Sequence, residues 1–100
     1  MSESRLPAIH PGEILRDLYL EPLEMSPYAL AKRLHVPRTR IERIAAEKTG
    51  ITPDTALRLA RFFNTTPEFW MNLQNSFDLK REAEVLREEL DSIAAYEVAA

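Results

Sequence analysis

The sequence predicts an all-α protein with five helices and no strands. Four segments place a proline ahead of apolar residues at helical spacing: "MSPYALAKRL", "HVPRTRIERI", "ITPDTALRLA" and "TTPEFWMNLQ". In three of them Ser or Thr directly precedes the proline, which is typical of an N-cap followed by Pro at the first helical position. A fifth segment, "HPGEILRDLYL", repeats the pattern with Pro11 ahead of Ile14, Leu15 and Leu18.

These start signals predict the element order. Helices are expected at about 11–20, 27–34, 37–47 and 53–63, and a fifth from 67 that runs far toward the C-terminus. The connections of two to six residues are typical of compact helical domains. We therefore expect one domain over residues 1–79, with a helix-turn-helix at about 27–47, and a C-terminal helical extension over residues 80–100.

The helices at 27–34 and 37–47 have the apolar spacing of a helix-turn-helix. Leu30 and Ala31 are expected to face inward, Val36 follows the turn, and Ile41 and Ile44 form a buried stripe. The alternative interpretation is a helical hairpin of the kind found in any small bundle. Spacing alone leaves both open.

Charge favours a DNA-binding function. Residues 26–61 carry eight Lys or Arg against three acids, whereas residues 76–100 carry three bases against seven acids. A basic middle indicates a polyanionic partner. With the isoleucines inward, helix 37–47 presents Arg38, Thr39, Glu42 and Arg43, with Arg40 to one side. First-turn side chains of such a helix contact base edges, and Arg can bind guanine with two hydrogen bonds.

Phosphate contacts are expected from the helix starts and from Ser26, Tyr28 and Lys48. Glu42 either pairs with Arg38 four residues earlier or accepts a hydrogen bond from cytosine N4.

Three stretches resemble the HigA antitoxins, which belong to the Xre-type, λ-repressor-like helix-turn-helix group. They are "IHPGEIL", "LAKRLHVPRTRI" and "GITPDTALRLARFFNTTPEFWMNLQNSFDL", and the resemblance covers about residues 9–79. The resemblance implies a homodimer that binds a palindromic operator in its own promoter. It also implies neutralisation of a HigB-type toxin, a small basic RNase that cuts mRNA at the ribosome. The family's DNA-reading residues lie early in the second helix of the motif, here Pro37 to Arg43.

The sequence departs from the family where glycine is usual. The turn before Val36 carries His35, and the loop usually written Leu-Gly-Leu-Ser reads Leu23-Glu24-Met25-Ser26. After the second helix of the motif, Ala46-Glu47 replaces the frequent Asn-Gly. Where the backbone keeps a positive φ, His35 and Glu24 each cost about 1 kcal/mol relative to Gly.

The helix from 67 is expected to contribute to both core and dimer interface. The expected interface residues are Phe69, Trp70, Leu73, Phe77, Leu86 and Leu90. The extension spaces Leu79, Ala83, Leu86, Leu90 and Ile93 like a short coiled-coil seam with an acidic outer face. It is interpreted as a dimer arm, as an acidic arm that docks on a basic toxin, or as a solvated helix folded back on its own domain.

Other classes of function are disfavoured. The chain contains no cysteine, and its two histidines are far apart in sequence, so no metal, cofactor or catalytic constellation is expected. Apolar runs are too short for a membrane span, and the first residues lack the apolar region of a signal peptide. A cytoplasmic antitoxin is therefore expected. The alternatives are a stand-alone Xre-type repressor and, more weakly, a helical interaction module that does not bind DNA.

Overall fold

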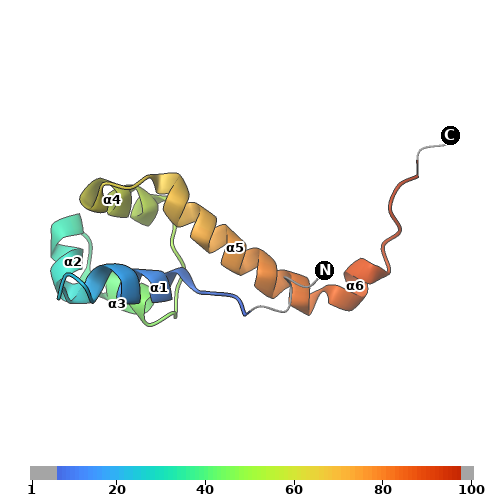
Figure 1. Ribbon diagram of the computed structural model, residues 1–100, viewed down its shortest axis with the longest axis horizontal. Coiled ribbons are helices and arrows are strands. Elements are labelled where there is room, and N and C mark those ends of the chain that lie inside the picture. The colour runs from blue at the N-terminus through green and yellow to red at the C-terminus, as the bar shows by residue number, and fades with distance from the viewer. Residues whose placement is uncertain (1–6, 98–100) are drawn as a thin grey trace.

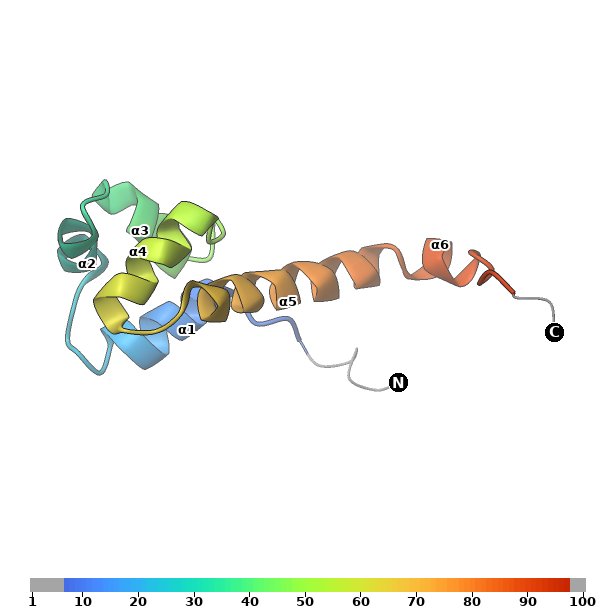
Figure 2. The same ribbon diagram turned by 90° about the horizontal axis from the view of Figure 1, so that it is seen from above.

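The computed structural model describes residues 7–97, which contain helices and turns and no strand (Figure 1). The helices are α1 (Pro11–Ile14), the π-helix η2 (Leu15–Leu20), α2 (Pro27–Leu34), α3 (Arg38–Ala45), α4 (Pro53–Phe63), α5 (Pro67–Val85) and α6 (Arg87–Asp91). Helices α1 to α4 gather around the first turns of α5, while the rest of α5 and α6 extend away as an arm (Figures 1 and 2). The predicted all-α fold is confirmed.

Three helix starts follow the predicted chemistry. The hydroxyls of Ser26, Thr52 and Thr66 accept hydrogen bonds from the backbone N–H three residues later, and a proline follows each of them. Helix α3 differs, because Pro37 is the cap residue itself and has an extended backbone with ψ of 145°. The expectation that Pro37 and Glu47 bound this helix is therefore corrected to Arg38–Ala45.

The first helix begins with a histidine cap. His10 Nδ1 accepts a hydrogen bond from the Gly12 N–H at 2.8 Å and so caps the helix start. A Cβ added to Gly12 would lie 1.8 Å from the carbonyl oxygen of Ile44, so the start of α1 touches the end of α3. The second half of this helix has π geometry, which the sequence analysis did not predict.

The core lies where α1 to α5 meet. The expected inward residues Leu30, Ala31, Ile41 and Ile44 are all buried. Trp70 is also fully buried, and its indole N–H donates to the Thr65 hydroxyl at 2.8 Å. Its expected place in a dimer interface is therefore wrong, because the chain's own core covers the whole side chain.

The backbone has positive φ at the positions where the family usually has glycine. Glu24, His35 and Glu47 have φ of 52°, 62° and 63°, and Asn64 ends α4 with φ of 58°. Each residue reverses the chain after a helical segment or turn. Side chains therefore occupy conformations that glycine adopts without strain.

The arm does not fold back on the domain. Helix α6 continues beyond the end of α5, away from α1 to α4 (Figures 1 and 2). Leu79 is 71% exposed and Leu90 is 46% exposed. The interpretation of the extension as a helix packed on its own domain is therefore corrected.

Candidate nucleic-acid interface

A tight turn fixes α2 against α3. His35 takes the left-handed conformation that ends α2, and its N–H bonds to the Lys32 carbonyl. The Val36 N–H reaches the Ala31 carbonyl at 3.1 Å. This pair of hydrogen bonds resembles a Schellman motif, which closes a helix and redirects the chain at once. The turn thereby sets the angle at which the first turn of α3 reaches the surface.

The first turn of α3 carries exposed polar side chains. Arg38, Thr39, Glu42 and Arg43 are exposed, while Ile41 and Ile44 face the core. Arg38 Nε lies 3.7 Å from Glu42 Oε2, so the structure shows the pairing that the sequence left undecided. Both side chains remain open to solvent, and such a pair contributes little to stability. Arg38 can therefore exchange this contact for another acceptor at small cost.

Arg40 is held more firmly than its neighbours. Its Nη1 lies 2.6 Å from Asp54 Oδ1, and the same oxygen accepts from Arg58 Nε at 2.8 Å. Arg58 Nη1 also donates to the Leu34 carbonyl at 2.9 Å. The two guanidinium groups, Arg58 first and Arg40 second, lower the pKa of the Asp54 carboxyl. This network ties α3 to the start of α4 and to the end of α2.

The start of α2 supplies a second group of candidate contacts. The Ser26 hydroxyl is occupied as an acceptor by the Ala29 N–H at 3.0 Å, which leaves its own O–H to donate. Tyr28 is exposed, and the Lys32 ammonium lies 5.9 Å from the centre of its ring. Hydroxyl donors at the helix start, with the Lys32 cation from the last turn of α2 close to one of them, suit phosphate oxygens.

The loop after α3 is fastened by Arg16. Its Nη1 donates to the Ala45 carbonyl at 2.8 Å and pairs with Glu47 at 3.1 Å. Hydrogen bonds to Asp17 and then to Glu47 raise the pKa of Arg16. Lys48 follows directly and is exposed. The contacts of Arg16 with Ala45 and Glu47 hold the backbone that precedes Lys48 in place.

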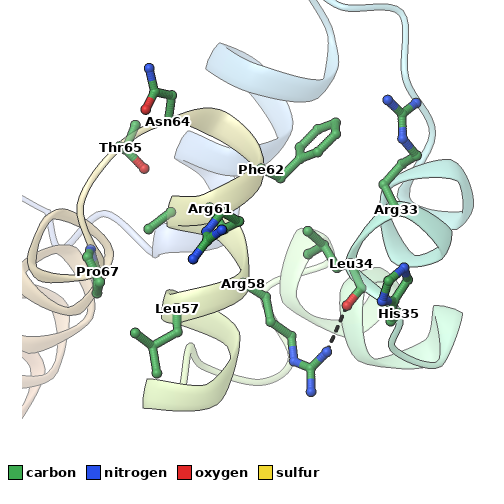
Figure 3. A pocket seen from close by; sticks show the side chains of 11 residues that line it. Arg33, Leu34, His35, Leu57, Arg58, Arg61, Phe62, Asn64, Thr65 and Pro67 are labelled. Carbon is green, nitrogen blue, oxygen red and sulfur yellow. Dashed lines mark hydrogen bonds between the residues drawn. The ribbon is translucent and has the colours of Figure 1, made fainter.

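Two features of this surface escaped the sequence analysis. The first is Asp54. Its position four residues before Arg58 on one helix could have predicted their ion pair, but nothing in the nearby sequence indicated its contact with Arg40. The second is a groove of about 790 Å³ between α2 and α4 beside the start of α5 (Figure 3). We call it the basic groove, because Arg33, Arg58 and Arg61 line it around Leu57 and Phe62.

The residues of α5 and α6 that are expected in the dimer interface differ in how exposed they are. Phe69, Leu86 and Leu90 are exposed, whereas Leu73 is half-buried against the core. Phe77 is half-buried, with its ring 4.8 Å from His10 and 5.4 Å from the Arg81 guanidinium. The exposed members, Phe69, Leu86 and Leu90, keep between 36% and 46% of their surface accessible to a partner.

Residues 7–97 contain no group of three or more His, Asp or Glu side chains that could hold a metal ion. No helix in the same range is long and apolar enough to cross a bilayer.

The chain is similar to proteins of known family. A family model described as "Helix-turn-helix" matches residues 16–70. "Virulence-associated protein I" of Dichelobacter nodosus is 54% identical over 78% of this chain and 72% of its own length. "Antitoxin HigA-1" of Vibrio cholerae is 32% identical over 79% of this chain and 74% of its own length. A solved structure of Pseudomonas aeruginosa antitoxin HigA with the higBA promoter superposes with a TM-score of 0.87, at 40% identity, covering 90% of this chain and 99% of that chain.

Proposed function

The chain belongs to the HigA antitoxin family of Xre-type helix-turn-helix proteins, and from that premise we propose that it regulates transcription by binding operator DNA through the first turn of α3. The Pseudomonas aeruginosa relative was solved with its higBA promoter. The supporting observation in this chain is the exposed set Arg38, Thr39 and Arg43 beside the start of α2. Base-reading donors and phosphate-binding groups then share one surface.

The contacts divide by chemistry. Arg38, Thr39, Arg43 and Glu42 read base edges in the major groove. Ser26, Tyr28, Lys48 and the backbone N–H groups at the helix starts hold phosphates. Arg40, bound to Asp54, contributes positive potential and orients α3. Pro37 sets the extended entry into the helix.

The protein acts as a homodimer on a palindromic operator in its own promoter. Two copies related by a two-fold axis match two half-sites one helical turn of DNA apart. Exposed Phe69, Leu86 and Leu90 support an interface along α5 and α6. A dimer also doubles the number of neutralised phosphates, which suits a regulator that must compete with nonspecific DNA.

The chain also neutralises, in the cytoplasm, a HigB-type mRNA-cleaving toxin by direct binding. The antitoxin name of its relatives supports this role. The acidic arm offers a surface separate from the DNA face, since residues 82–91 carry five carboxylates and one arginine. An acidic surface suits a basic RNase, and its separation from α3 leaves operator binding available.

A titration of the chain with its own promoter fragment tests the DNA-binding proposal. Affinity should fall linearly with salt on logarithmic axes, with a slope of about −0.9 for each phosphate contacted. A scrambled duplex of equal length is the control and should bind more weakly by about three orders of magnitude or more. Equal affinity for both duplexes would leave only nonspecific electrostatic binding and would contradict the proposal.

A further inference from the structure

The basic groove concentrates positive charge in a chain that is acidic overall. The chain carries a formal net charge of −3. Among residues 7–97, three arginines and no acidic residue line the groove. Its volume of about 790 Å³ lies within the range of about 300–1,000 Å³ that is typical of ligand pockets. Because a concave surface of one sign attracts ligands of the opposite sign, the groove suits an anionic partner.

Two of the three arginines are open to a new partner. Arg58 is already engaged by the Asp54 carboxylate at 2.8 Å. Arg61 is exposed, and neither it nor Arg33 forms an ion pair with any residue of 7–97. The Arg33 guanidinium lies 5.1 Å from the centre of the Phe62 ring. Each of these two guanidinium groups can therefore bind a carboxylate without displacing an existing ion pair.

Apolar side chains share the groove with the arginines. Leu57 is 60% exposed, and Phe62 and Pro67 are half-buried. Figure 3 shows Arg61 with Leu57 and Pro67 on one side and Arg33 on the other. Phosphate oxygens gain nothing from such apolar surface, whereas a protein segment that covers it removes the surface from water. The lining therefore favours an acidic protein segment over a nucleic acid.

Polar side chains at the end of α4 suit the backbone of such a segment. Asn64 is exposed and ends the helix with φ of 58°. Its amide can both donate and accept hydrogen bonds. The Thr65 hydroxyl accepts from the Trp70 indole N–H at 2.8 Å, which leaves its own O–H to donate. Both residues line the groove, so they can bond to the N–H and C=O groups that a peptide backbone presents.

We propose that the basic groove binds a short acidic segment of another protein, in which carboxylate side chains flank a large apolar residue. The carboxylates pair with Arg61 and Arg33, and the apolar residue packs on Leu57 and Pro67. Arginine clusters are a recurring means of recognising acidic motifs, and arginine is enriched at protein interfaces. This partner differs from the toxin of the proposed function, because the groove repels a basic protein.

The groove is separate from the surfaces proposed for DNA and for the second copy. None of the described residues that line it is among the proposed operator contacts, and none is among Phe69, Leu86 and Leu90. It lies at the end of α2, whereas Ser26 and Tyr28 lie at its start, about 12 Å away along eight residues. The acidic segment and the operator can therefore be bound together.

Fluorescence anisotropy with a defined set of peptides tests the inference. Each labelled peptide has about nine residues, an extended length of about 30 Å, and alternates Asp or Glu with Leu, Ile or Phe. At least one should bind the full-length chain about tenfold more tightly than its counterpart with Asn or Gln in place of the acids. It should also bind more tightly than a peptide with the same acids and serine between them. A set in which no peptide exceeds both counterparts would overturn the inference.

A charge reversal locates the binding site. Arg61→Glu should weaken binding of that peptide by about tenfold or more. Lys32→Glu makes the same charge change on exposed α2, outside the groove, and is the matched control. Both side chains are exposed, and thermal unfolding checks that both variants remain folded. Equal losses of peptide affinity would show general electrostatic attraction and overturn the inference.

Operator DNA in the same assay separates the peptide from the other polyanion. With the chain saturated by operator in about 0.15 M salt, where charges beyond about 8 Å are largely screened, peptide affinity should change less than about threefold. Displacement of the peptide by the duplex would assign the groove to DNA phosphates and overturn the inference. Peptide binding by a chain that binds no operator would contradict the proposed function and support the inference.

Discussion

Arg40 and Asp54 join the first turn of α3 to the first turn of α4 through an ion pair of 2.6 Å. The same carboxylate oxygen binds Arg58, which in turn binds the Leu34 carbonyl at the end of α2. Asp54 therefore links α3 to α4 directly, and it links both of them to the end of α2 through Arg58. The negative charge of Asp54 also offsets the attraction of Arg40 and Arg58 for any phosphate.

Replacing Asp54 by Asn should affect DNA binding in two opposite ways. The variant loses a negative charge, so affinity for a scrambled duplex should rise severalfold. Arg40 and α3 are less firmly oriented, so the ratio of operator to scrambled affinity should fall. Fluorescence anisotropy with both duplexes measures the ratio. An unchanged ratio would show that the Asp54 contacts do not orient the DNA-reading helix.

Arg38 and Lys48 should contribute differently to DNA binding, the first to base specificity and the second to affinity for phosphate. Arg38→Ala should relax specificity at one base pair of each half-site, at a cost of about 1–3 kcal/mol. Lys48→Ala should weaken binding to all sequences equally and reduce the magnitude of the salt slope by about one. Competition with single-base operator variants distinguishes the two roles. Uniform weakening by Arg38→Ala would identify Arg38 as a phosphate contact.

Gly12→Ala should destabilise the fold strongly. The added methyl group would lie 1.8 Å from the Ile44 carbonyl oxygen, so backbone must move. We expect a loss of about 3 kcal/mol in the free energy of unfolding, at the upper end of typical overpacking costs. Gly50→Ala is the control, because its methyl group meets the end of the Gln74 side chain and not backbone. Urea unfolding should rank Gly50→Ala as the milder change; the reverse order would argue against the α1–α3 contact.

His10 should make stability depend on pH. Burial lowers its pKa below the ordinary 6.5, although the Glu47 carboxylate and the Thr49 backbone oppose the shift. A lowered folded-state pKa contributes stability that is present above pH 6.5 and is lost as pH falls through the folded value. The free energy of unfolding should therefore decrease below pH 6.5.

The variant His10→Asn isolates this contribution. Asn retains a side-chain acceptor for the Gly12 N–H but does not titrate. Its unfolding free energy, measured by urea titration at several pH values, should decline less from pH 7 to pH 5. An identical decline in both proteins would assign the pH dependence to other groups.

Glu24→Gly should stabilise the protein. Glu24 has φ of 52°, is exposed and lies outside the helices. Removing the Cβ strain should raise the free energy of unfolding by about 0.5–1 kcal/mol, net of the added freedom of the unfolded chain. Thermal unfolding measures the change. Destabilisation would show that the Glu24 side chain makes a compensating contact.

The sequence predicted the helix starts that depend only on neighbouring residues. Ser26, Thr52 and Thr66 each precede a proline and cap a helix, because the hydroxyl and the missing N–H act within one turn. The predicted start of α3 at Pro37 was wrong. Val36 before it offers no capping oxygen, and the helix begins one residue later. The π geometry of η2 has no marker in its sequence.

Features set by tertiary contacts were harder to predict. Trp70 and Phe69 are adjacent apolar residues, yet only Trp70 turns into the core. The apolar character of a residue does not show whether its side chain is buried in the core of its own chain or against a partner. The contact of Arg40 with Asp54 spans fourteen residues and depends on how α3 crosses α4. The residue pattern and the family resemblance both gave the expected DNA-reading positions, but neither gave the Asp54 carboxylate that binds Arg40.

Co-purification tests the antitoxin assignment most directly. The untagged chain would be expressed with the tagged product of the small reading frame beside its gene, and the growth of the host would be recorded. We predict a stable complex and relief of the growth arrest that the tagged protein causes alone. No complex and no relief, with the promoter fragment still bound, would contradict toxin neutralisation and leave a dimeric repressor.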